Sequence, residues 1–255
     1  MGEAAENTRR ARLVELRQYL AAAEGLGQAV GTVLPFGAAA IDRALPWGGL
    51  PLAALHEIES GSIASGGAGA ATAFLAGILA RLTPGRPVLW CLRQPDLHAP
   101  GLARAGLLAK RLLLVRTPNE RELLWAMEEG LRSCALAAVV GEVETLSTAA
   151  SRRLQLAAET AGVTGFVLHR SAGTAVASAA VTRWRVMALP SVPVAGEPGV
   201  GRPRWQVELL RCRGGMPGAW EVEVGDAQWD WTARHGVVSA PLADRPVLRH
   251  RRAAG

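Results

Sequence analysis

Lysine is almost absent from this sequence. The chain of 255 residues has 28 basic side chains, and all of them except Lys110 are arginines. It has one Tyr and three Phe but eight Trp, and its three cysteines, Cys91, Cys134 and Cys212, form no CxxC pair. Cys91 and Cys134 lie in or beside apolar runs, so we expect buried thiols in a reducing compartment rather than a disulfide framework or a zinc site.

Long hydrophobic runs are also missing. No apolar run approaches the roughly 20 residues that a membrane span needs. The N-terminal stretch is polar with helical spacing, unlike the basic stub and apolar core of a signal peptide. We therefore expect a cytoplasmic protein that makes no membrane contact.

The net positive charge lies entirely in the C-terminal part. Residues 1–150 hold 14 basic and 14 acidic side chains, whereas residues 151–255 hold 14 basic and 8 acidic ones, a net charge of +6. Because arginine favours bidentate contacts to phosphate, one interpretation is a surface for nucleic acid or an acidic partner. The other is that arginine replaces lysine through codon bias and the charge merely solvates the protein. Both interpretations stay open.

Hydrophobic patterning predicts an α/β fold with a mainly parallel, doubly wound sheet. A helix is expected over 8–24, and antiparallel strands follow the alternating region. We expect an N-terminal helix and linker at 1–31, a main domain at 32–232 and a flexible basic tail at 233–255. The expected strands are 52–58, 88–92, 111–115, 136–140, 165–169, 181–189, 205–212 and 220–224, and the expected helices after the first are 41–45, 68–82, 99–109, 119–132 and 147–161.

The loop between strand 52–58 and helix 68–82 has the glycines of a phosphate loop but not its lysine. Backbone N–H groups at Gly66, Gly67 and Gly69 could cradle phosphate at a helix N-terminus, and Ser65 and Thr72 are nearby hydroxyls. No lysine or arginine lies between Arg43 and Arg81 to neutralise the phosphate charge. The loop therefore predicts a degenerate nucleotide site.

Two further positions of such a site are also degraded. A magnesium-holding aspartate would end strand 136–140, where Gly141 is followed by Glu142 and Glu144. A water-activating glutamate would follow strand 88–92, where Gln94 stands instead, and an amide cannot accept a proton as a carboxylate does. Asp96, Glu142 and Glu144 are candidates for an unorthodox metal site, although ordinary carboxylates at strand ends are the favoured interpretation. We expect no metal, no cofactor and no catalytic residue.

Arginine and tryptophan alternate in the C-terminal strands. Period-2 spacing predicts that Arg183 and Arg185 share one face, and that Arg211 and Arg213 share a face of their own strand. Such a face could contact phosphate or stack on bases. The alternative is a solvated outer face with Trp184 and Trp205 turned into the core. We favour this orientation for the tryptophans and the binding interpretation for the arginines.

The order of these motifs resembles the RecA core over residues 34–170, and the chain as a whole resembles the ImuA family over about residues 8–232. The glycine–alanine loop without lysine fits this family, as do TRWRV..LPS at 182–191 and W..ELLR.RGG at 205–215. The lead-in residues that carry the resemblance are Leu34, Pro35, Phe36, Gly37, Ile41, Asp42, Leu45, Gly48, Gly49, Leu50, His56 and Glu57.

The resemblance implies a non-catalytic RecA-like adaptor in SOS-induced error-prone translesion synthesis. Its implied partners are an ImuB-like inactive Y-family polymerase, RecA, an error-prone replicative-type polymerase and single-stranded DNA. One alternative is a divergent ATPase or recombinase that uses Ser65, Thr72 and Glu142. A second alternative is a cell-division inhibitor of the SulA type, and a third is a scaffold without nucleic-acid contact.

Overall fold

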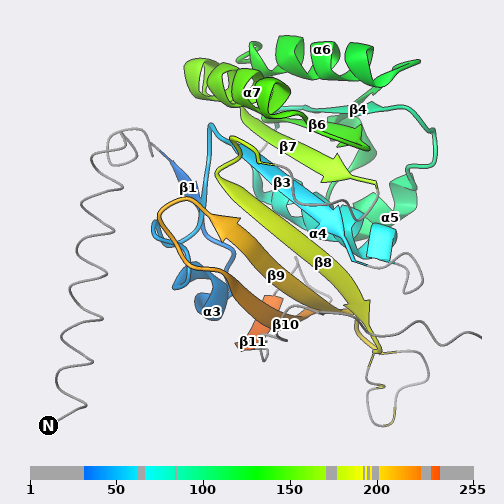
Figure 1. Cartoon of the computed structure of the whole chain (residues 1–255). Coiled ribbons are helices and arrows are strands. Elements are labelled where there is room, and N and C mark those ends of the chain that lie inside the picture. The colour runs from blue at the N-terminus through cyan, green and yellow to red at the C-terminus, as the bar shows by residue number, and fades with distance from the viewer. Residues whose placement is uncertain are drawn as a thin grey trace, which may run out of the picture.

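The computed structural model shows an α/β protein built on one large sheet (Figure 1). It describes residues 32–61, 67–83, 85–170, 177–191, 193, 196 and 201–224, together with the backbone of 231–235. The predicted helix over 8–24, Ser65, Gly66 and the segment after 235 lie outside the described residues. Within the described part, no helix is long and apolar enough to cross a membrane.

The main sheet has nine described strands in the order β11-β10-β9-β8-β3-β7-β6-β4-β5. The six strands from β8 to β5 in this order are parallel, whereas β9, β10 and β11 add in antiparallel fashion. The bounds are β3 Leu55–Ser60, β4 Val88–Leu92, β5 Leu112–Arg116, β6 Ala138–Val143, β7 Thr164–His169, β8 Thr182–Leu189, β9 Arg204–Cys212, β10 Gly218–Val224 and β11 Trp231–His235. A mostly parallel α/β sheet is thereby confirmed.

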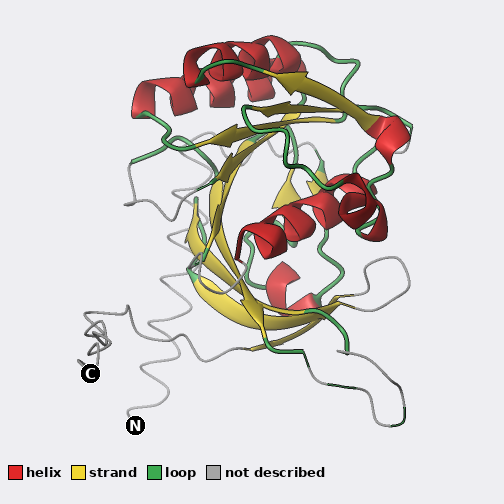
Figure 2. Cartoon of the chain, turned by 90° about the vertical axis from the view of Figure 1, so that its right-hand side faces the viewer, coloured by secondary structure: helices red, strands yellow, loops and turns green. Residues whose placement is uncertain are grey.

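Helices cover the two faces of the parallel part. Helices α6 and α7 lie together on one face, and the curved sheet wraps around α4 on the other (Figures 1 and 2). The strands β1 Val33–Leu34 and β2 Leu50–Pro51 form a separate antiparallel pair. The helix bounds are α3 Ala39–Asp42, α4 Gly67–Arg81, α5 Ala99–Arg104, η2 Ala109–Arg111, α6 Glu120–Leu131 and α7 Thr148–Ala161.

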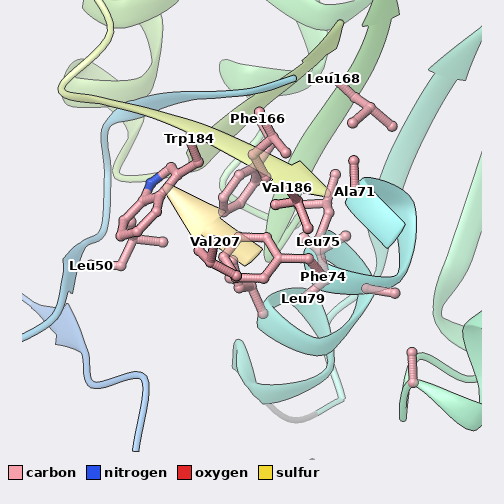
Figure 3. Packing of buried hydrophobic residues seen from close by; sticks show 14 of the residues in the cluster. Leu50, Ala71, Phe74, Leu75, Leu79, Phe166, Leu168, Trp184, Val186 and Val207 are labelled. Carbon is pink, nitrogen blue, oxygen red and sulfur yellow. The ribbon is translucent and has the colours of Figure 1, made fainter. Parts of the chain in front are cut away.

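Aromatic side chains fill the space between α4 and the strands β8, β9 and β10. Figure 3 shows Phe74 of α4 packed beside Trp184, Val186 and Val207. The ring centroids of Phe74 and Trp184 are 6.0 Å apart, and Trp184 lies 6.4 Å from Trp220. These separations suit favourable ring contacts. Trp184 and Trp205 are 1% and 5% exposed, which confirms their inward orientation.

The lead-in motif has a structural purpose. The Asp42 carboxylate accepts hydrogen bonds from the backbone N–H of Phe36 at 2.6 Å and of Gly37 at 3.0 Å. Arg81, at the end of α4, donates to the carbonyl of Phe36 at 2.7 Å and also to that of Pro35. Gly37 has φ +77°, a conformation that favours glycine. The motif therefore fastens α3 to the end of α4.

Several predicted elements need correction. The sixth strand is Ala138–Val143 rather than 136–140, so Gly141 and Glu142 lie inside the strand. The helix expected over 99–109 ends at Arg104, because Gly106 takes φ +86° and turns the chain. Strand β11 was not predicted and continues to His235, past the expected domain end at 232. Cys134 is exposed, not buried as expected, whereas Cys91 is buried.

Candidate functional site

A cavity of about 320 Å³ opens at the carboxyl ends of β3, β4, β6 and β7, beside the first turns of α4. Ligands of open α/β sheets commonly bind at this position. Of the predicted nucleotide-site residues, Gly69, Thr72 and Glu142 line the cavity. Gly67 is the first residue of α4, whereas Ser65 and Gly66 lie outside the described residues.

Arg170, which follows β7, is the central charge of this cavity. Its Nη1 lies 2.5 Å from Glu142 Oε2 and 3.1 Å from Asp96 Oδ1, and its Nη2 lies 2.5 Å from Asp96 Oδ2. The second oxygen of Glu142 accepts a hydrogen bond from Trp90 Nε1 at 2.8 Å. The hydrogen bond from Arg170 holds the pKa of Asp96 below its usual range, and the same bond raises the pKa of Arg170.

This cluster has consequences for ligand binding. Both oxygens of Glu142 are hydrogen-bonded inside the protein, and its side chain is 3% exposed. Two carboxylates and one guanidinium give the charged lining a net charge of −1, which opposes a polyphosphate. Thr72 donates its hydroxyl to the carbonyl of Ala68 at 2.9 Å. The arginine nearest to the position of the missing lysine is Arg170, just after β7, and its charge is already neutralised by Asp96 and Glu142.

Gly141 does not face this cavity. A Cβ at this position would lie 2.0 Å from Met127 Sδ, so the residue faces α6 on the opposite side of the sheet. The expectation that Gly141 follows the strand and takes the position of the magnesium ligand was therefore wrong. Strand β6 runs from Ala138 to Val143 instead of ending at residue 140, so Gly141 lies within it. Glu142 is the residue of β6 that points into the cavity.

Gln94 is not brought to the cavity either. It is exposed and lines a separate hollow with Arg93, Arg116 and Thr117. Glu144 is bound by Arg93, with Nη1 3.1 Å from Oε1. Among the residues that the structure describes, no group of three His, Cys, Asp or Glu side chains is placed to hold a metal ion. Asp96, Glu142 and Glu144 are instead bound by two arginines.

Arg183 and Arg185 share one face of β8, as the spacing predicted, but they face carboxylates on neighbouring strands. Arg183 Nε lies 3.4 Å from Glu57 Oε2 and 3.3 Å from Glu59 Oε2. Arg185 reaches Glu59 Oε1 at 2.6 Å and Glu208 Oε2 at 3.2 Å. In the sheet register Glu57 stands beside Arg183 and Glu59 beside Arg185. We define Glu57, Glu59, Arg183, Arg185 and Glu208 as the charge ladder.

Arg211 and Arg213 are bonded differently, and Arg213 lies one residue past the end of β9. Arg211 Nη1 donates to the Ser178 carbonyl at 2.6 Å, and Arg213 Nη2 donates to the Ala179 carbonyl at 2.8 Å. Carbonyl oxygens accept hydrogen bonds without cancelling charge. These two arginines therefore fix the segment before β8, and no described carboxylate forms a salt bridge with either of them.

The sequence reasoning missed Glu57 and Glu59 as ladder members. Glu57 also accepts hydrogen bonds from Ser178 and from His169 Nε2, the latter at 3.0 Å. Burial alone would raise the pKa of Glu57, but the bonds from His169 and Ser178 and the charge of Arg183 outweigh burial and lower it. The available signal was two acidic residues at period-2 spacing, matching the two arginines at 183 and 185.

Comparison with known proteins gives one family. No protein-family model matches the chain. SulA from Pseudomonas aeruginosa shows 26% identity at a TM-score of 0.39, covering 45% of this chain and 96% of that one. Two relatives from Caulobacter vibrioides strains, each named Protein ImuA, are 42% identical over 206 residues, which is 76% of this chain and 84% of theirs. The chain therefore belongs to the ImuA family.

Proposed function

We propose that this protein is a RecA-like adaptor without ATPase activity that serves SOS-induced, error-prone translesion DNA synthesis in the cytoplasm. In this role it links a complex containing an ImuB-like inactive Y-family polymerase to RecA or to DNA, alongside an error-prone replicative-type polymerase. Membership of the ImuA family supports the assignment to the mutagenesis cassette. The mostly parallel sheet with a glycine-bearing loop before α4 supports the relation to RecA.

The observation that carries the non-catalytic part of this proposal is the Asp96–Arg170–Glu142 cluster. A nucleotide-hydrolysing site needs a cation for the phosphates and a carboxylate for magnesium or water. Here the nearest cation and the nearest carboxylates bind each other at 2.5 Å. A metal–nucleotide complex could enter only if this cluster broke. The buried Glu142 carboxylate would then be left without its cation, which is energetically costly.

We expect purified protein to hydrolyse ATP no faster than a buffer blank, with or without single-stranded DNA. The reason is that no residue between Arg43 and Arg81 neutralises phosphate and that Glu142 is held by Arg170 and Trp90. Phosphate release is the measurement, with a RecA ATPase as the positive control. DNA-stimulated release that Glu142→Gln removes would contradict the proposal and favour the divergent ATPase.

For DNA contact we propose Arg211 and Arg213 rather than the charge ladder. Arg183 and Arg185 are offset by three carboxylates, whereas Arg211 and Arg213 hydrogen-bond to carbonyl groups and keep their full charge. A cation of the protein displaces the counterions condensed on DNA when it contacts a phosphate, and a cation already paired with a carboxylate is less able to do so.

The double substitution Arg211→Ala/Arg213→Ala is expected to weaken binding to single-stranded DNA. It should reduce the slope of log affinity against log salt by about 1.4, at ~0.7 for each phosphate contact. Fluorescence anisotropy at several salt concentrations measures this slope. The exposed Arg152→Ala on α7 is the matched control. An unchanged affinity and slope in the double variant would remove DNA from the proposed partners of this face.

A further inference from the structure

Strand β5 forms one edge of the main sheet. It pairs with β4, and within the described part of the chain no strand pairs with its other side. The outer edge of such a strand presents unpaired backbone N–H and C=O groups that can pair with another chain. Proteins usually protect such edges with charged side chains or proline placed along the strand.

The middle of β5 carries leucines instead. Leu113 and Leu114 are 49% and 57% exposed, and Leu108, shortly before the strand, is 45% exposed. Because successive side chains of a strand point to opposite faces, Leu113 and Leu114 lie on the two sides of the same edge. An extended segment added to this edge would cover both leucines. Three large exposed side chains in one short stretch distinguish this edge from isolated surface residues such as Trp125.

Positive charges stand at the two ends of the apolar stretch. Lys110, the one lysine of the chain, precedes β5, and Arg116 ends the strand. Both are exposed, and neither forms a salt bridge with a carboxylate that the structure describes. A segment that fits this edge should therefore be apolar in the middle and acidic at its ends.

A second copy of this chain fits the edge poorly in two antiparallel registers. A two-fold antiparallel pairing of β5 with itself, centred on Leu113, would place Arg116 opposite Lys110 on both sides. Centring it between Leu113 and Leu114 would place Arg116 opposite Arg111. Like charges directly opposite each other destabilise a strand pair. The charge pattern therefore disfavours a homodimer in these two registers. Centred on Leu114, the pairing would place Arg116 opposite Leu112, so a dimer in that register is an outcome of the test below.

We propose that the edge of β5 is a docking surface for an extended segment of another protein, with apolar residues that cover Leu113 and Leu114 and acidic residues that pair with Lys110 and Arg116. Main-chain hydrogen bonds would supply much of the affinity, as in other strand additions. This inference deepens the proposed adaptor function and rests on it for its biological purpose. Its geometry depends on β5 alone.

The test uses the full chain and a short synthetic peptide with a Val-rich middle and a pair of Asp residues at each end. We expect the peptide to bind, and the exposed-site variant Leu113→Glu/Leu114→Glu to bind it roughly tenfold more weakly or worse. Leu156→Glu, a leucine 65% exposed on α7, is the matched control and should bind normally. Equal thermal unfolding of both variants verifies folding.

Charge reversal gives a second, independent readout. Lys110→Glu/Arg116→Glu should lose the Asp-flanked peptide and gain a peptide of the same core with Lys pairs at its ends. The proposal is overturned if neither peptide binds the unaltered protein, if both bind it equally, or if a concentration-dependent dimer is lost in Leu113→Glu/Leu114→Glu. The last result would assign the edge to a second copy.

The single lysine also permits a chemical test. A carbodiimide that joins amines to carboxylates should link an N-acetylated Asp-flanked peptide to Lys110, as mapped by mass spectrometry. In Lys110→Arg, which keeps the charge, no link should form at position 110 or elsewhere on β5. A mapped link to the unaltered protein that forms away from Lys110 contradicts the docking geometry. If the edge fails these tests while an ImuB-like polymerase still co-purifies with Leu113→Glu/Leu114→Glu, the adaptor function stands and uses another surface.

Discussion

Replacing Arg183 by alanine is expected to lower the free energy of unfolding by about 3–5 kcal/mol, the usual cost of removing one partner from a buried ion pair. The Arg183 side chain is 11% exposed, and the Glu57 and Glu59 side chains are each 2% exposed. Without Arg183, Arg185 would still face Glu59, but Glu57 would keep only His169 and Ser178. Urea unfolding near pH 7 measures the loss.

Two controls separate this explanation from a loss of packing. Arg183→Lys keeps a positive charge and should lose less stability than the alanine variant, although lysine lacks the planar fork that can meet two carboxylates. The variant Arg183→Ala/Glu57→Gln removes the charge of Glu57 as well, so the two changes should be less than additive. Full additivity, or an Arg183→Ala cost below about 1 kcal/mol, would mean that water reaches these carboxylates.

The charge ladder also changes how the basic half of the chain is interpreted. Residues 151–255 have a net charge of +6, which suggested a phosphate-binding face. Carboxylates for two of the four candidate arginines come from β3 and β9, so β3 supplies acidic residues that lie in the neutral half of the sequence. A count of charge along the chain therefore overstates the charge that this face presents to a partner.

Elements with local signals could be predicted from the sequence. Strand β4 matches its expected bounds because Val88–Leu92 is a nearly continuous apolar run, as buried parallel strands require. Helix α6 begins where Asn119 accepts a hydrogen bond from Glu122 N, and α7 begins where Ser147 accepts one from Ala150 N. Such N-caps are readable because one side chain determines the start of the helix.

The features that the sequence did not reveal depend on contacts between distant segments. The inward direction of Glu142 follows from β6 being paired with β4 and β7 in a register that also turns Gly141 toward Met127. Arg170 meets Asp96 across a separation of 74 residues, and no local pattern indicates that pair. The position of the cavity could thus be predicted in part from Gly69 and Thr72, but the ion cluster inside it could not.

The second large effect is expected from pH, through His56. This side chain is fully buried, and Nε2 lies 2.8 Å from the Pro51 carbonyl, so Nε2 carries the proton and donates. Nδ1 lies 2.7 Å from Thr182 Oγ1 and accepts its proton, while Trp184 Nε1 donates to the same hydroxyl at 2.7 Å. The chain of bonds from Trp184 to Pro51 is complete with a neutral imidazole. Protonation of His56 would turn Nδ1 into a donor, and the Thr182 hydroxyl would lose the acceptor of its own proton.

Burial lowers the pKa of His56 from 6.5 to about 4. Between these values the unfolded chain binds a proton that the folded protein does not, so folding stability falls as the pH is lowered through this window. A shift of this size corresponds to about 3 kcal/mol when fully developed, and to about 2 kcal/mol between pH 7 and pH 5. Glu57 adds little to the loss at pH 5, because its lowered pKa costs stability only as the pH falls through the unfolded value of 4.5 and below.

The measurement is urea unfolding of the unaltered protein and of His56→Gln at pH 7 and pH 5. The glutamine variant should be less stable at pH 7, because it loses part of the hydrogen-bond chain, but should lack the loss of about 2 kcal/mol on acidification. The exposed His98→Ala should keep the full pH dependence. If His56→Gln retains it as well, another titrating group controls acid stability, and the neutral imidazole between β2, β3 and β8 is not the element that makes this fold sensitive to acid.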